Sequence, residues 1–229
     1  PFGWVEAHDP SWTPNTTDLP GRRYCYAAQP DVVGWNLARL LEAMAFTMND
    51  PEQLHAVMDA YREAYRRARQ QAWIERLGLH EWNEEDELLV RDLQQFMYDS
   101  KVDHVPLLRH LGEGVTTSEA LHDAGIIYTA EPDLASIDSW IERWMERTDG
   151  TPNLAVMQRT VPVFTPRNWV LQLAIDDAER GDWTKAEALA ARLMRPFERL
   201  DEDEGAWWSG PRPDWALSRP GCSMLSCSS

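Results

Sequence analysis

Residues 50–78, DPEQLHAVMDAYREAYRRARQQAWIERLG, carry the clearest helical pattern in the chain. Asp50 is a helix-capping residue, and Pro51 fits the first helical turn, where its missing N–H leaves no bond unmade. Gly78 suits the left-handed position that ends many helices. Between them, apolar or small residues recur at steps of three and four, which indicates one long helix with an apolar stripe. These residues are Leu54, Met58, Tyr61, Tyr65, Ala68 and Ala72.

The same spacing predicts helices on both sides of this stretch. The first has a stripe formed by Val33, Leu37, Leu40, Leu41, Met44 and Met48. Asn83 is expected to cap another helix. The first turn of that helix (residues 84–87) is acidic and expected to be solvated, and the positive end of the helix dipole stabilises such negative charges. Its buried face holds Leu89, Leu93, Phe96 and Met97. Further helices are predicted at 105–111, after a capping box at 116–119, and over 134–145.

The C-terminal part of the chain mixes helices with irregular segments. Pro152, Pro162 and Pro166 predict that residues 151–168 are mostly extended or loop. Two closing helices are expected over residues 168–180 and 183–196. From residue 201 onward glycine, proline, serine and acidic residues dominate, which predicts irregular chain. Internal repeats and strand alternation are absent from the sequence, so the fold class is mainly α.

Composition excludes several classes of protein. The 229 residues carry 22 Lys and Arg against 38 Asp and Glu, a net charge of −16. Such a charge repels phosphate backbones, so we expect no nucleic-acid partner. No apolar stretch approaches the roughly 20 residues that cross a bilayer, so we expect no membrane partner. The 3 cysteines do not form a secreted disulfide framework.

A search for catalytic motifs finds none complete within the chain. The 6 histidines include no H-E-x-x-H pattern, and the sequence indicates no metal site. Residues 112–114, Gly-Glu-Gly, lack the other residues of a phosphate-binding loop and are expected to form a turn. A G-x-S-x-G nucleophile elbow is also absent. The residues alone therefore indicate no catalytic, cofactor-binding or metal-binding position.

The N-terminal stretch, residues 1–40, is the most informative about function. Prolines and glycines predict a loop up to residue 30, with polar side chains at Asn15, Asp18, Arg22 and Arg23. Amide, carboxylate and two guanidinium groups close together suit an anionic ligand or a docking peptide. A structured surface loop without a ligand is the alternative that composition leaves open.

Short motifs in this stretch follow one another in a specific order. They are Pro-Phe-Gly at 1–3, Asp-Pro at 9–10, Asn15 to Asp18, Gly21 to Tyr24, Gln-Pro at 29–30 and Trp-Asn-Leu-Ala-Arg-Leu at 35–40. Near the other end stand Ala-Ile-Asp at 174–176, Gly-Asp at 181–182, Arg-Pro-Phe at 195–197, Pro-Asp-Trp at 213–215 and Ser-Cys-Ser-Ser at 226–229. In this order the motifs resemble the SelO family, selenoprotein O and its cysteine-containing bacterial relatives, which are pseudokinase-like protein adenylyltransferases.

The resemblance implies a reaction, a fold and a division of the chain. The reaction is transfer of AMP from ATP to Ser, Thr or Tyr hydroxyls of protein substrates, with Mg²⁺ or Mn²⁺. The fold is the helical C-lobe remainder of a protein-kinase-like domain, with an activation-segment-like loop at 1–30, helices over 31–200 and an irregular tail at 201–229. The family's catalytic, nucleotide-binding and metal-binding residues precede Pro-Phe-Gly. We therefore expect the chain to need a missing N-terminal part as its partner and to be inactive alone.

The resemblance also implies a redox role for the tail cysteine, Cys227. Relatives can pair this residue with a cysteine in the activation loop, and Pro14 occupies that position here. Cys25 is the substitute partner that we expect, and Cys222 is a rival. Localisation is expected to be cytoplasmic for a bacterial protein and mitochondrial for a eukaryotic one. A non-catalytic acidic helical interaction module is the alternative function.

Overall fold

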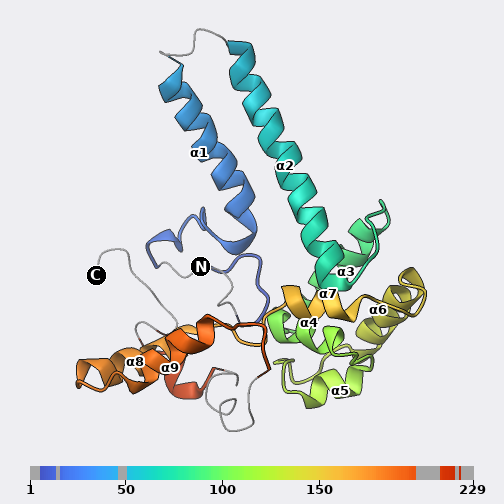
Figure 1. The fold of residues 1–229 in the computed structure, drawn as a ribbon, viewed down its shortest axis with the longest axis vertical. Coiled ribbons are helices and arrows are strands. Elements are labelled where there is room, and N and C mark those ends of the chain that lie inside the picture. Colours follow the sequence, from blue (N-terminus) through green and yellow to red (C-terminus); the bar gives the residue numbers. More distant parts are fainter. Residues whose placement is uncertain (1–5, 14–15, 46–50, 200–211, 220–221, 223–229) are drawn as a thin grey trace.

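A computed structural model describes residues 6–13, 16–45, 51–199, 212–219 and 222, and Figure 1 shows their arrangement. The helices are α1 (Gln29–Met44), α2 (Pro51–Leu77), α3 (Asp86–Asp99), α4 (His104–Gly112), α5 (Ser118–Asp123), α6 (Leu134–Arg147), α7 (Leu154–Thr160), α8 (Asn168–Glu179) and α9 (Thr184–Leu193), with short 3-10 turns η2 (Thr16–Asp18), η3 (Tyr26–Ala28) and η4 (Asp214–Ala216). Strand pairing within the described residues consists of two isolated bridges, Ala7–Asp103 and Val102–Ile127. The mainly α prediction is confirmed. None of the described helices is both long and apolar enough to cross a membrane.

Helices α1 and α2 form a hairpin that projects from the rest of the molecule (Figure 1). Its arms approach closely because Gly34 faces Tyr61: a Cβ at Gly34 would lie 3.2 Å from Tyr61 Cε1. The Tyr61 hydroxyl also donates a hydrogen bond to the carbonyl of Pro30 at 2.6 Å. With 27 residues, α2 is about 40 Å long and reaches down into the main core.

The stripe predicted for α1 is only partly buried. Val33, Leu40 and Met44 are 50%, 54% and 41% exposed, although they belong to the apolar stripe. The buried residues of α1 are instead Val32, Gly34 and Leu41. The reason is that α1 packs mainly against α2 and η3.

The main hydrophobic core joins the lower end of α2 to helices α3, α4, α6 and α7. At its centre the rings of Trp140 and Trp144 are stacked 5.9 Å apart. Their indole N–H groups donate to the carbonyls of Leu89 and Leu77, both at 2.8 Å. Two large apolar rings are thus buried without an unsatisfied polar atom.

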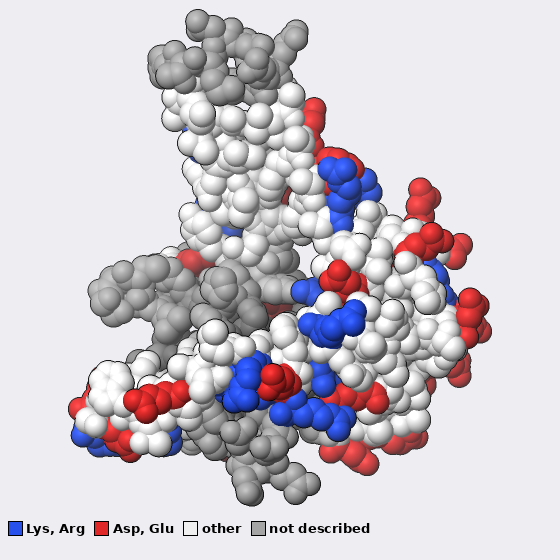
Figure 2. Space-filling model, viewed as in Figure 1, with Lys and Arg blue, Asp and Glu red and all other residues white. Residues whose placement is uncertain are grey.

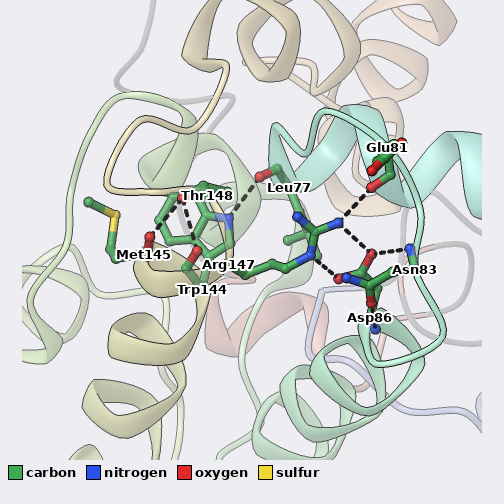
Figure 3. A network of polar contacts seen from close by, with 8 residues as sticks. All are labelled: Leu77, Glu81, Asn83, Asp86, Trp144, Met145, Arg147 and Thr148. Carbon is green, nitrogen blue, oxygen red and sulfur yellow. Dashed lines mark hydrogen bonds and ion pairs between the residues drawn. The ribbon is translucent and has the colours of Figure 1, made fainter.

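The start of α3 is fixed by reciprocal hydrogen bonds. The Asp86 N–H donates to Asn83 Oδ1 at 3.1 Å, and the Asn83 N–H donates to Asp86 Oδ2 at 2.7 Å. The residue that directly precedes the helix is Glu85, whose side chain makes no capping bond, so the predicted cap at Asn83 lies two positions too early. The acidic run 84–87 is not wholly solvated, because Asp86 is buried and bonds Arg147 of α6 (Figure 3).

Residues 151–168 are mostly extended or loop, as predicted, but they also hold the helix α7, which the prediction did not include. Asn153 caps the helix by accepting a hydrogen bond from the Val156 N–H at 3.2 Å. Pro152 precedes this cap and Pro162 follows the helix end, so the prolines bound the helix instead of breaking it. Met157 is fully buried in the main core, which supplies the tertiary stabilisation that a helix this short needs.

The other predicted helices are present with shifted ends. The capping residue of α5 is Thr117, one position after the first residue of the predicted capping box, and it accepts from the Ala120 N–H at 3.4 Å. Helices α8 and α9 pack against each other as a second hairpin. A smaller core at this hairpin includes Trp169, Leu189, and two residues from the predicted tail, Ala216 and Cys222.

Candidate functional site

The N-terminal loop is organised around Asp18. Its Oδ1 accepts a hydrogen bond from the Arg23 N–H at 3.0 Å, and its Oδ2 accepts one from the Tyr24 N–H at 2.8 Å. The Thr13 hydroxyl donates to the same Oδ2 at 3.3 Å. In turns, an aspartate side chain commonly accepts hydrogen bonds from nearby backbone N–H groups that would otherwise bond a main-chain carbonyl. Asp18 therefore holds the loop together.

Arg22 connects this turn to the preceding segment. It has a left-handed backbone (φ 46°), and its Nη1 donates to Ser11 Oγ at 2.6 Å. The Ser11 hydroxyl and backbone N–H each donate to Asp9 Oδ1 at 2.8 Å. A continuous chain of polar contacts thus runs from Arg22 through Ser11 to Asp9.

Arg23 makes a different kind of contact. Its guanidinium carbon lies 4.2 Å from the centre of the Trp35 ring, and that of Arg39 lies 5.4 Å from the same ring. Cations over an indole face are attracted by its electron density. Arg23 therefore fixes the loop to the first turns of α1.

The structure brings three of the four loop residues named from the sequence into one turn: Asp18, Arg22 and Arg23. Each of the three makes internal contacts, as a structured surface loop would. Both arginines are still exposed, so binding of an anionic ligand or a docking peptide by this loop stays a prediction. Asn15 lies outside the described residues.

Two histidines join the loop to the body of the molecule. The rings of His8 and His104 are 6.0 Å apart, and the Tyr26 ring lies 5.8 Å from His8. His8 Nε2 and His104 Nδ1 are buried and find no hydrogen-bond partner among the described residues. Burial lowers the pKa of both rings; that of His104 falls to about 3, because the charges of His8, Arg167 and Arg76 act in the same direction as burial. Both rings are therefore neutral at neutral pH.

A buried ion pair anchors the same region. Asp103, beside the bridge to Ala7, accepts hydrogen bonds at Oδ2 from Arg167 at 2.5 Å and from the Tyr128 hydroxyl at 3.1 Å. Burial raises the pKa of Asp103, and the adjacent Arg167 charge opposes this effect. Glu6 meets Arg212 of the C-terminal segment at 3.3 Å. Four distant segments of sequence therefore converge behind the loop.

A groove of about 1040 Å³ separates the N-terminal loop from helices α2 and α3. The loop and the start of α1 contribute His8, Asp9, Ser11, Tyr26 and Gln29 among others; α2 contributes Tyr61, Tyr65, Ala68, Arg69, Ala72, Trp73 and Arg76; α3 contributes Arg91, Gln94, Gln95 and Tyr98. Its charged lining consists of three arginines and one aspartate, Asp9.

This groove was missed from the sequence, although one signal for it was present. The stripe Tyr61, Tyr65, Ala68 and Ala72 was correctly recognised as one side of a helix. In the structure this side lines the groove, and Tyr65 is 41% exposed. The spacing of apolar residues along a helix does not by itself distinguish a stripe that packs in a core from one that lines an open groove.

The cysteines named as redox candidates differ in accessibility. Cys25 is a half-buried free thiol directly before η3, and Cys222 is a buried free thiol. Burial raises the pKa of Cys222, which lowers its content of reactive thiolate. Cys227 lies outside the described residues, so its pairing with Cys25 stays a prediction.

Metal ligation finds no support in the part of the chain that the structure describes. Within it, no group of three or more His, Cys, Asp or Glu side chains is placed to hold a metal ion. We therefore assign no metal ligand to the described residues.

Comparison with known proteins gives consistent matches. A family model described as "Protein adenylyltransferase SelO" matches residues 1–194. A protein nucleotidyltransferase YdiU from Xanthomonas campestris pv. campestris (strain B100) is 36% identical over 241 aligned positions, which include 100% of this chain and 46% of the relative. YdiU proteins from Xanthomonas oryzae pv. oryzae (strain MAFF 311018) and Xanthomonas axonopodis pv. citri (strain 306) are 38% and 35% identical. The chain thus spans about half the length of these relatives.

Proposed function

Because this chain belongs to the SelO family, we propose that it is the C-terminal portion of a protein adenylyltransferase. The whole enzyme would transfer AMP from ATP to a serine, threonine or tyrosine hydroxyl of a protein. The match over residues 1–194, together with the YdiU relatives, carries this proposal. Those relatives are bacterial, which favours the cytoplasm over the mitochondrion.

The reaction requires groups beyond those found here. A substrate oxygen forms a bond to the α-phosphorus of ATP, the bond from that phosphorus to pyrophosphate breaks, and a base takes the hydroxyl proton. Cationic side chains and a divalent metal stabilise the charge that develops at phosphorus in such transfers. We assign ATP and Mg²⁺ or Mn²⁺ to an N-terminal part of the protein, since the family's residues for them precede Pro-Phe-Gly. The 229-residue chain alone would then be inactive.

The architecture fits the helical C-lobe remainder of a kinase-like domain. Residues 1–30 would form an activation-segment-like loop, residues 31–200 the helical body and residues 201–229 the tail of one larger domain. The convergence of the loop, α4, α8 and the segment at Arg212 on one buried polar cluster supports a single domain.

A chimera tests the function directly. The part of the Xanthomonas campestris relative that precedes its Pro-Phe-Gly would be joined to this chain and incubated with protein substrates, Mg²⁺ or Mn²⁺, and ATP labelled at its α-phosphorus. Label in protein, with AMP found by mass spectrometry on a hydroxyl residue, is the expected result. The whole relative is the positive control, and this chain alone should transfer nothing.

Two results would contradict the proposal. Label transferred from ATP marked at its γ-phosphorus would indicate a kinase. A chimera that folds but is inactive, beside an active relative, would favour the alternative of an acidic interaction module.

A disulfide between Cys25 and Cys227 would regulate this enzyme. The half-buried Cys25 thiol in the loop supports the pairing, and the raised pKa of Cys222 disfavours the rival. Peptide mapping after mild oxidation should find Cys25 linked to Cys227, and still find it in Cys222→Ser. Free thiols alone, or a Cys222–Cys227 link, would contradict the pairing.

A further inference from the structure

We propose that the groove between the N-terminal loop, α2 and α3 docks an acidic, extended segment of the protein substrate. This docking role rests on the proposed function, because it names the class of substrate that the enzyme would recognise. The groove would bind the substrate through its charge and shape and would take no part in the chemical step.

The charged side chains that line the groove differ in sign from the excess over the whole chain. The chain has a net charge of −16, whereas the charged lining of the groove is three arginines and one aspartate. Figure 2 shows acidic side chains around the outer edge of the part formed by α3, α5 and α6, while the viewed face of the hairpin is mainly uncharged. An arginine that no acidic side chain neutralises attracts anionic partners, and the attraction is local to its place in the groove.

The three arginines differ in how far their charge is already neutralised. Arg69 donates two hydrogen bonds to Glu87, at 2.7 Å and 2.8 Å, and Arg91 pairs with Asp92 at 3.1 Å. Arg76 is exposed and lies 5.6 Å from the centre of the Trp73 ring. Of these three described arginines, it is therefore the one without an ion pair, and we assign it the main contact with a substrate carboxylate.

The remaining lining suits a polypeptide. Aromatic rings of Tyr26, Tyr65, Trp73 and Tyr98 provide flat apolar surface. Gln94 adds a side-chain amide that can bond a peptide main chain, whereas the amides of Gln29 and Gln95 already donate within the chain. A volume of about 1040 Å³ is at the upper end for small-molecule sites and suits several residues of an extended chain. The wall at His8 and Tyr26 belongs to the activation-segment-like loop, so a docked segment would lie next to the proposed catalytic region.

A binding experiment on the 229-residue chain tests this without nucleotide, so its outcome is independent of AMP transfer. The probe is a peptide of glutamate, serine and leucine carrying an uncharged dye, compared with the same peptide in which lysine replaces glutamate. Fluorescence anisotropy should show binding of the acidic peptide only, weakened by salt. Arg76→Glu should weaken binding about tenfold or more.

Arg67→Glu is the matched control, because Arg67 is an exposed arginine of α2 that does not line the groove. It should bind the acidic peptide like the unmodified chain, and both variants should have unchanged circular dichroism. Tyr98→Ala, which removes a ring that is 49% exposed, should also weaken binding. Equal losses in both arginine variants, no loss in Arg76→Glu, or equal binding of the lysine peptide would overturn the proposal.

The last measurement compares binding of the acidic peptide by the chimera and by the 229-residue chain. If it binds the acidic peptide as the short chain does, the groove is open in the larger protein and the inference stands. If the short chain binds and the chimera does not, the preceding part of the enzyme covers the groove and the inference is wrong. Either result can occur whether or not the chimera transfers AMP.

Discussion

Arg147, the last residue of α6, donates two hydrogen bonds to Asp86, the first residue of α3, at 2.7 Å (Nε to Oδ1) and 3.1 Å (Nη2 to Oδ2). The same guanidinium donates to the carbonyl of Glu81 at 2.8 Å (Figure 3). The Asp86 side chain is only 1% exposed, while that of Arg147 is 23% exposed. One arginine therefore joins α6, the start of α3 and the loop between α2 and α3.

Removing this arginine should destabilise the fold strongly. Arg147→Ala leaves the buried Asp86 carboxylate without its counter-charge, which should lower the free energy of unfolding by about 3 kcal/mol. Arg143→Ala on the same helix is the control, because Arg143 pairs with the more exposed Asp92. Its cost should stay below about 1 kcal/mol. Urea unfolding followed by circular dichroism measures the loss of unfolding free energy in both variants. Equal losses would contradict the prediction that the buried pair of Arg147 stabilises the fold more than the exposed pair of Arg143.

Stability should fall in mild acid because of the two buried histidines. The pKa of His104 is about 3 in the folded chain, against 6.5 for an ordinary histidine, and that of His8 is also lowered. At pH values between about 3 and 6.5, His104 binds more protons in the unfolded chain than in the folded chain. The free energy of unfolding should therefore fall, by up to about 1.4 kcal/mol per pH unit and group, as pH decreases from about 6.5. Above about pH 6.5 both histidines are neutral in the folded and in the unfolded chain, so this loss of stability does not occur.

His104→Phe keeps a ring at this position and should flatten the dependence on pH. His80→Phe changes a histidine that is exposed in the folded chain, and should leave the slope as it is. Unfolding measured at several pH values between 7 and 4 compares them. A His104→Phe protein with an unchanged slope would refute the assignment.

The loop should loosen when Asp18 loses its carboxylate. Asp18→Ala removes the acceptors of the Arg23 and Tyr24 N–H groups, so hydrogen exchange at these two amides should accelerate. Asp31→Ala, an exposed change in the first turn of α1, should leave the two amides unaffected. Slow exchange retained in Asp18→Ala would mean that the turn is held by other contacts.

Gly78 should tolerate alanine worse than Gly125 does. Both have a left-handed backbone, at φ 62° and 69°. An added Cβ at Gly78 would lie 2.7 Å from the Asn153 backbone nitrogen, whereas one at Gly125 meets nothing within 4 Å. Gly125→Ala should therefore cost about 1 kcal/mol from backbone strain alone, and Gly78→Ala about 3 kcal/mol. Similar midpoints in thermal unfolding would contradict the steric part of this argument.

Much of the local structure could be predicted because it depends on residues close in sequence. Spacing of apolar residues located α2, α3 and α6, helices were also expected where α4, α8 and α9 lie, and the capping box at 116–119 marked the start of α5. The order of short motifs predicted the family that the comparisons then showed. Helix α7 was missed because its stability comes from burying Met157, a contact with distant residues.

The sequence by itself determined most of the helices and the family, since periodicity, capping and motif order are properties of neighbouring residues. Only the tertiary structure decided which side of each helix is covered. Val33 and Tyr65 have the spacing of core residues but stay exposed, and Asp86 belongs to an acidic run but is buried. The physical reason is that burial depends on which elements pack together, and this packing makes a groove from α2, α3 and the N-terminal loop.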